Sequence, residues 1–145
     1  MISTITNRGR LAFMVFENEF KVRVFLKFLK RLARHVKRPI FLIVDRHPVH
    51  RAAGVRRWLA ANEKRIRMFL LPGYSPELNP GELLNQDVKS NALGRQRPWS
   101  RDEMIEGVRG YLRSTQRQPS IVRSYFQEEH VRYAARHLSA INCSR

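Results

Sequence analysis

Short β-branched and aromatic runs at the start of the chain are interrupted by a polar turn. Residues 3–6 and 10–16 have the composition of strands, and Asn7 and Gly9 lie between them. Asn and Gly readily adopt the backbone conformations of tight turns, so this pattern predicts a hairpin of two neighbouring strands. From Glu19 the apolar residues recur at helical spacing instead, which predicts a helix that ends before Pro39. Its apolar positions are Phe25, Phe28, Leu29, Leu32 and Val36.

The next blocks predict a strand, a helix and a second strand. Residues 40–44 form a continuous apolar run that ends at Asp45. Such a run is typical of a strand buried on both faces of an α/β sheet, and it places Asp45 at the carboxyl end of that strand. Residues 51–62 carry an apolar stripe and predict a helix, and residues 65–71 predict another buried strand.

Pro and Gly residues between positions 72 and 80 mark a loop, after which the helical pattern returns. A helix is expected over residues 81–93, with Glu82 in its first turn and its end at Gly94. The C-terminal segment has helical character over residues 121–126 and 131–138.

A further helix is expected over residues 101–115. Ser100 and Glu103 have the spacing of a capping box, in which two side chains satisfy the free N–H groups at a helix start. Trp99 and Met104 stand at the two positions of a hydrophobic staple around that start.

Composition narrows the class of protein. The chain has 145 residues, 43% of them hydrophobic, which suits one domain with one core. Its 28 Lys and Arg against 12 Asp and Glu give a net charge of +16, spread along the chain, and this favours a polyanionic partner such as nucleic acid. No apolar run reaches the roughly 18 residues of a membrane span, and the first residues lack the apolar stretch of a signal peptide. The single cysteine, Cys143, agrees with the reducing cytoplasm.

Two carboxylates are candidates for metal chemistry. Asp45 ends a strand, Glu82 begins a helix, and 36 residues lie between them. Ligands of open α/β sheets bind at the carboxyl ends of strands, where paired carboxylates can hold Mg²⁺ for phosphodiester chemistry. A purely structural interpretation is that Asp45 caps the following turn and that Glu82 interacts with the positive end of its helix.

Two sequence motifs contain these carboxylates. One is the apolar strand that ends in Asp45 and is followed five residues later by His50; the other is Tyr-Ser-Pro-Glu-Leu-Asn-Pro-Gly-Glu at residues 74–82. Residues 41–89 thereby resemble the catalytic core of insertion-sequence transposases of the mariner superfamily, which are DDE endonucleases with an RNase H-like fold. Residues 8–11 and 125–135 extend the resemblance over nearly the whole chain. It implies that Asp45 and Glu82 are the second and third catalytic carboxylates and bind Mg²⁺ or Mn²⁺ for cleavage and strand transfer of DNA.

Other residues near the motifs are candidates for DNA contact or for support. His50 is expected to contact the scissile phosphate or to orient Asp45, and the structural alternative is a solvated or capping histidine. Asn79 is expected to fix the start of the Glu82 helix. The basic residues are ordinary solvated charges individually and indicate a phosphate-binding surface only together. They are Arg51, Arg56, Arg57, Lys89, Arg95 and Arg97.

The chain also departs from the family pattern. Arg46 stands where an Asn is common, and Asn85 where a Trp is common. The family's first catalytic Asp lies on a strand before the hairpin, and no acidic residue before Asp45 stands on a suitable strand here. That strand is central in an RNase H-like sheet, so without it two strand edges would lack partners.

We therefore expect an α/β, RNase H-like mixed sheet flanked by helices and lacking its first, central strand. Residues 1–116 would form this partial catalytic domain and residues 117–145 a helical tail. The expected function is that of a transposase fragment, inactive alone, whose partners are transposon-end and target DNA and an upstream-frame fragment, the full-length transposase or a second copy. Two alternatives are a non-catalytic nucleic-acid-binding module that modulates the transposase, and a free-standing nuclease with two acids.

Overall fold

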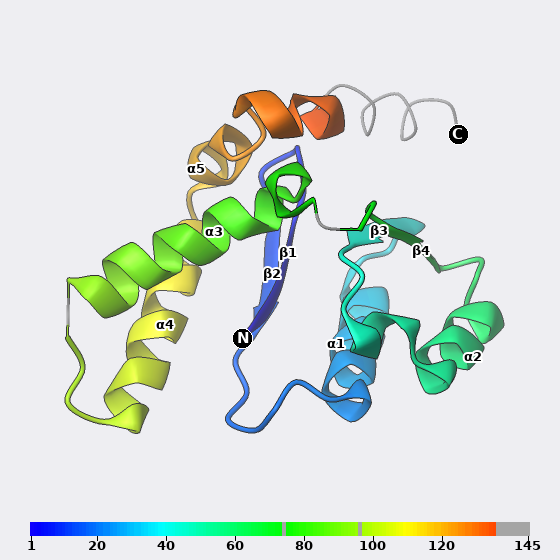
Figure 1. Cartoon of the computed structure of the whole chain (residues 1–145), viewed down its shortest axis with the longest axis horizontal. Coiled ribbons are helices and arrows are strands. Elements are labelled where there is room, and N and C mark those ends of the chain that lie inside the picture. The colour runs from blue at the N-terminus through cyan, green and yellow to red at the C-terminus, as the bar shows by residue number, and fades with distance from the viewer. Residues whose placement is uncertain (74, 96, 136–145) are drawn as a thin grey trace. The chain divides into compact units, whose positions relative to one another are not determined.

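The computed structural model describes residues 1–73, 75–95 and 97–135, and it contains small sheets flanked by helices (Figure 1). This confirms the α/β class expected from the sequence. The chain divides into two compact units. The first contains residues 3–15 and the chain from residue 77, and the second contains residues 16–76.

The first unit begins with the predicted hairpin. Strands β1 (Ile2–Ile5) and β2 (Leu11–Met14) form a two-stranded sheet, and the N–H of Thr6 donates to the carbonyl of Arg10 at 2.9 Å. Gly9 has φ 86°, and a Cβ on it would lie 2.5 Å from the carbonyl oxygen of Pro119. Only glycine therefore fits a turn that lies this close to α5 (Pro119–Ser124).

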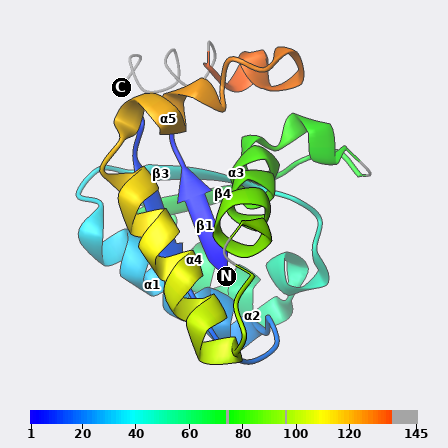
Figure 2. The ribbon, with the colours of Figure 1, turned by 90° about the vertical axis from the view of Figure 1, so that its left-hand side faces the viewer.

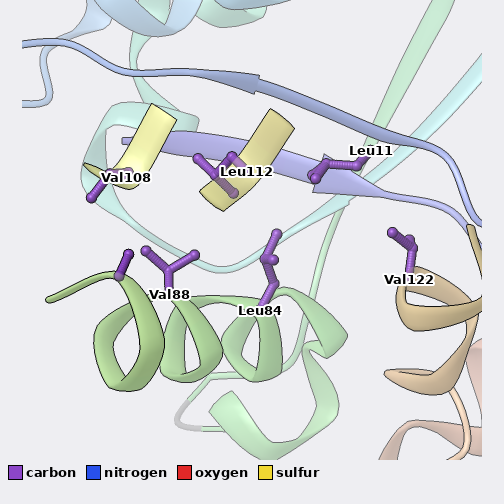
Figure 3. Packing of buried hydrophobic residues seen from close by; sticks show 7 residues of the cluster. Leu11, Leu84, Val88, Val108, Leu112 and Val122 are labelled. Atoms are coloured by element: carbon purple, nitrogen blue, oxygen red, sulfur yellow. The ribbon is translucent and has the colours of Figure 1, made fainter. Parts of the chain in front are cut away.

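The core of the first unit joins segments far apart in sequence. Helix α4 (Arg101–Gln116) packs on β2 and contacts α3 (Pro80–Val88) (Figure 2). One cluster of buried side chains, drawn in Figure 3, comes from the hairpin, from α3 and the helical turn that follows it, and from α4 and α5. Its members are Leu11, Leu84, Val88, Ala92, Val108, Leu112 and Val122.

The end of the helical segment that begins with α3, and the cap at the start of α4, are as the sequence predicted. The hydrophobic staple is not. Helix α3 continues as a π-helix over Lys89–Gly94, so the helical segment ends at Gly94 as expected. The Ser100 hydroxyl accepts from the N–H of Glu103 at 3.1 Å, which confirms the cap. The staple is wrong, because the Trp99 side chain is 96% exposed and Met104 is 38% exposed. The Glu103 carboxylate instead accepts from the N–H of Trp99 at 2.9 Å, so hydrogen bonds alone fix this helix start.

A polar network joins the C-terminal segment to α3. The Tyr125 hydroxyl donates to Oδ2 of Asp87, and the Asn91 amide donates to Oδ1 of Asp87 at 2.7 Å. Burial raises the pKa of Tyr125 well above its ordinary value, and the hydrogen bond to the carboxylate raises it further. The network therefore requires a protonated tyrosine.

Tyr125→Phe should lower the free energy of unfolding by about 1.5–3 kcal/mol at pH 7, because a hydrogen bond to a charged group is lost. The raised pKa also implies pH dependence. Above about pH 10 the unfolded tyrosine ionises while the folded one stays protonated, so the unfolded chain binds fewer protons and stability falls as pH rises. Urea unfolding at pH 7, 9 and 10.5 measures both effects, and the variant should show the shallower decline.

Tyr133→Phe is the matched control, because the Tyr133 hydroxyl donates to the neutral carbonyl of Leu78 at 2.7 Å. A neutral hydrogen bond contributes about 0.5–1.5 kcal/mol, so the loss should be smaller than in Tyr125→Phe. Equal losses in the two variants would contradict the role given to Asp87.

The second unit is a strand–helix–strand arrangement preceded by a helix. Its elements are α1 (Val22–His35), β3 (Ile40–Val44), the 3₁₀ helix Pro48–Arg51, α2 (Ala53–Ala61) and β4 (Ile66–Leu70). Strands β3 and β4 pair in parallel, with Ile40 opposite Ile66 and Val44 opposite Leu70. Helix α1 begins three residues later than expected, at Val22, and its buried residues Phe25, Phe28, Leu29 and Leu32 are the predicted ones.

The apolar runs of β3 and β4 predicted strands that are buried on both faces, and this prediction is wrong. Leu42 and Ile66, which share a face by register, are 5% and 1% exposed. On the other face Phe69 is 50% exposed. Helices of this unit cover one face only, so an apolar run here does not mean that both faces are buried.

The described strands form two separate two-stranded sheets, β1–β2 and β3–β4. None of these strands joins the two sheets. Beyond α5, the chain forms a 3₁₀ helix over Glu129–Val131, and residues 132–135 are helical. Cys143 and the end of the helix expected over 131–138 lie outside the described residues. No helix in the described part of the chain is long and apolar enough to cross a membrane.

Candidate functional site

Asp45 follows β3 directly and organises the turn after it. Its Oδ1 accepts from the N–H of His47 at 2.9 Å and lies 2.9 Å from Nδ1 of His50. The carboxylate thus has the capping role that the structural interpretation assigned to it. The side chain is nevertheless 53% exposed, so it remains accessible to a ligand from solvent.

His50 is held by aromatic rings and is bonded to Asp45. The residue is 8% exposed, and its ring centroid lies 4.6 Å from that of Phe25 and 5.8 Å from that of Phe20. Its Nδ1 lies within hydrogen-bond distance of both Oδ1 and the carbonyl oxygen of Asp45. Both oxygens are acceptors, so we assign the hydrogen to Nδ1. Burial and hydrogen bonding favour the orienting role of His50 over phosphate contact.

His50→Ala should release the Asp45 carboxylate. We expect the free energy of unfolding to fall by about 1–3 kcal/mol, because a buried hydrogen-bonded ring is removed. The N–H of His47, which donates to Oδ1 of Asp45, should exchange with solvent faster. NMR-detected hydrogen exchange measures this, with Arg51→Ala as the exposed neighbouring control. Unchanged exchange at His47 would exclude the orienting role.

Arg46 is tied to the end of β4. Its Nε donates to the carbonyl of Leu71 at 2.9 Å, and the N–H of Leu71 donates to the carbonyl of Val44 at 2.8 Å. The guanidinium therefore extends the contact between the ends of the two strands. This contact engages Nε of the guanidinium, the group that could otherwise compete with a metal ion for Asp45.

Glu82 lies in the first turn of α3, in the first unit. Asn79 caps this helix, because its Oδ1 accepts from the N–H of Gly81 at 3.0 Å, and Pro80 occupies the first helical position. This confirms the role expected of Asn79. The Asn85 amide donates to Oε1 of Glu82 at 3.3 Å, so this residue contacts the carboxylate directly.

Asp45 and Glu82, each taken by itself, have donor atoms that suit a divalent cation. Both side chains present carboxylate oxygens, the ligands that Mg²⁺ and Mn²⁺ prefer. Their described hydrogen bonds engage Oδ1 and Oε1, which leaves the second oxygen of each group for another ligand. Within residues 1–73, 75–95 and 97–135, no group of three or more His, Cys, Asp or Glu side chains is placed to hold a metal ion.

The basic candidates for DNA contact are exposed in both units. Arg51, Arg56 and Arg57 are exposed on the second unit, and Lys89, Arg95 and Arg97 on the first. Their role in binding phosphate stays a prediction.

Sequence reasoning missed two supports of the candidate site. Phe20 contacts both His47 and His50, with ring centroids 5.2 and 5.8 Å apart, and Asn85 bonds to Glu82. The spacing of Phe16 and Phe20, four residues apart ahead of the α1 helix, was a usable signal for the aromatic cluster. The Asn85 contact also had a signal, because residues three apart on a helix are neighbours on its surface.

Comparison with known proteins gives one match. A family model described as DDE superfamily endonuclease matches residues 1–105, a stretch that contains the hairpin, Asp45 and Glu82. No curated protein and no solved structure matches the chain significantly. Because the family match covers well over half of its residues, the chain belongs to the DDE superfamily endonucleases.

Proposed function

We propose that this chain is the part of a mariner-superfamily transposase that carries the second and third catalytic carboxylates, Asp45 and Glu82. The observation that carries the proposal is the family match over residues 1–105, which contains both carboxylates in order. The substrate is DNA at transposon ends and target sites, and the reaction is strand cleavage followed by strand transfer. The net charge of +16 suits such a polyanionic substrate.

Asp45 and Glu82 are the residues that would hold Mg²⁺ or Mn²⁺. When bound, such ions activate an attacking oxygen and stabilise a leaving oxygen of the phosphodiester. The chain's own contribution is to position the ligands: His50 holds the carboxylate of Asp45 and Asn85 that of Glu82.

The catalytic domain is completed by a further strand. The described strands form two separate pairs, and an RNase H-like sheet needs a central strand that pairs with both. In the family that strand also bears the first catalytic Asp. We propose that cleavage requires this strand, which an upstream-frame fragment or the full-length transposase can supply, and that residues 1–145 without it do not cut DNA.

The test is strand cleavage of end-containing DNA with Mg²⁺ or Mn²⁺. The chain is assayed alone and mixed with the polypeptide encoded directly upstream. Cleavage only in the mixture supports the proposal. Cleavage by the chain alone contradicts the need for a further strand and favours the two-acid nuclease.

A second function, non-catalytic DNA binding that modulates the complete transposase, is favoured by the net charge of +16, which attracts DNA whether or not the carboxylates act in cleavage. This function predicts salt-sensitive DNA binding that tolerates Asp45→Ala and Glu82→Ala, with no cleavage in any mixture.

A further inference from the structure

The turn between the π-helix and α4 exposes the largest apolar side chain of the first unit. Trp99 is 96% exposed, more than any other large hydrophobic residue in the described part of the chain. Tryptophan is a mostly buried residue in folded proteins, so an indole that contacts almost nothing has no role in packing. A side chain of this kind is available to a partner.

The backbone beneath this indole is fixed. The N–H of Trp99 donates to Oε2 of Glu103, and Ser100 caps α4. Arg97, two residues before Trp99, is the one described non-glycine residue with positive φ, at 40°, a backbone conformation that few side chains adopt. The indole is thus projected from an ordered base, which lowers the entropy cost of binding.

The charge around Trp99 selects the kind of partner. From Lys89 to Arg101, both included, the chain has four basic side chains and no acidic ones. Arg95 and Arg97 are exposed there, and of the two acids that follow, Glu103 is engaged in the cap. An exposed aromatic ring beside basic residues is the arrangement with which proteins bind single-stranded nucleic acid, since bases stack on the ring and phosphates meet the charges.

We propose that Trp99 is a stacking platform for an unpaired base of DNA, with Arg95 and Arg97 contacting the adjacent phosphates. This inference rests on the proposed function in one respect, which is that the partner is DNA. It adds a binding site for single-stranded or unstacked DNA, such as a cleaved end provides, that is separate in sequence from both carboxylates. Stacking on one aromatic residue contributes about 1–3 kcal/mol per base, which corresponds to roughly 5- to 150-fold in affinity.

The test uses the indole as its own probe. The chain has two tryptophans, Trp58 and Trp99, so Trp58→Phe leaves Trp99 as the single tryptophan, which excitation at 295 nm observes without the tyrosines. In this background, titration with a 20-nucleotide oligothymidine in metal-free buffer should quench the fluorescence. In the wild-type background, Trp99→Ala should weaken oligothymidine binding about 5- to 150-fold, measured by anisotropy of labelled DNA, and should change binding to a blunt duplex by less than twofold.

Three further variants separate stacking from other contacts. Trp99→Phe should keep most of the affinity, whereas Trp99→Leu, which is apolar without a π-face, should lose it as Trp99→Ala does. Arg97→Gln should lower the slope of log affinity against log salt by about 0.7 for the single strand. Met104→Ala, a control at the next exposed apolar residue, should bind like the wild type.

Several outcomes would overturn the inference. These are no quenching at saturation, equal losses for single strand and duplex, or full affinity in Trp99→Leu. Because the assay contains no metal and measures no cleavage, loss of the stacking effect with intact DNA binding refutes this inference alone. Absence of any DNA binding by the wild-type chain would refute the proposed function as well.

Discussion

Asp45→Asn should abolish metal-dependent strand cleavage by the chain mixed with its upstream partner, and Glu82→Gln should do the same. Each change removes the negative charge of a proposed metal ligand and keeps the size of the side chain. Metal ions contribute several kcal/mol to the stabilisation of the transition state, and about 1.4 kcal/mol corresponds to tenfold in rate. The expected loss is therefore about 10³-fold or more, measured by the yield of nicked end DNA with Mg²⁺ or Mn²⁺.

The control for these variants is Glu77→Gln. Glu77 is an exposed acid in the 3₁₀ helix Pro76–Leu78, five residues before Glu82, so it tests for a general effect of lost charge. It should cleave like the wild-type mixture, and all three variants should bind end DNA with similar affinity. Cleavage near the wild-type rate by Asp45→Asn would show that this carboxylate is not a metal ligand and would leave only its capping role.

Leu84→Ala should strongly destabilise the first unit. Leu84 is 0% exposed on α3 and belongs to the same buried cluster as Leu11, Leu112 and Val122. Truncation of a buried leucine loses transfer free energy and leaves a cavity, which together lower the free energy of unfolding by about 2–5 kcal/mol. Urea unfolding followed by circular dichroism measures the change.

Leu83 offers a matched control, because it is the neighbouring leucine of the same helix and is only half-buried. Leu83→Ala has the same change in helix propensity and should cost less than about half as much. Equal losses in the two variants would contradict the packing described for α3. Because α3 carries Glu82, the Leu84 variant should also lose cleavage at a lower temperature than the wild type.

Local signals predicted the elements of the fold well. Residues 40–44 were predicted as a strand residue for residue, and Ser100 as the cap of α4, because both signals act within a few residues. The start of α1 was predicted three residues early, since the charged residues before Val22 carry no strong cap. The burial of β3 and β4 and the staple at Trp99 were wrong because they depend on which layers cover a segment, and hydropathy does not contain that information.

In the candidate site too, local features were predictable from the sequence and features that depend on tertiary packing were not. The place of Asp45 after a strand, and of Glu82 after a capping Asn79, follow from the local sequence. The contact between His50 and Asp45 was one of two roles foreseen for His50. The contribution of Phe20 and Phe25 to holding His50 depends on how α1 packs against the turn after β3, which no local pattern reports.

The close approach of Gly9 to Pro119 has a consequence for how the chain is made. The hairpin also bonds to distant residues, since the Gln116 amide donates to the carbonyl of Leu11 and the Asn7 amide to that of Ala134. On a ribosome these strands emerge more than 100 residues before their partners, so the residues that pack around Leu11 are synthesised much later. Residues 16–76, which form the second unit, can fold before then. We expect the hairpin, although it is synthesised before the rest of residues 1–145, to be among the last segments to acquire its native contacts. Premature termination before α5 should leave it a target for chaperones or proteases.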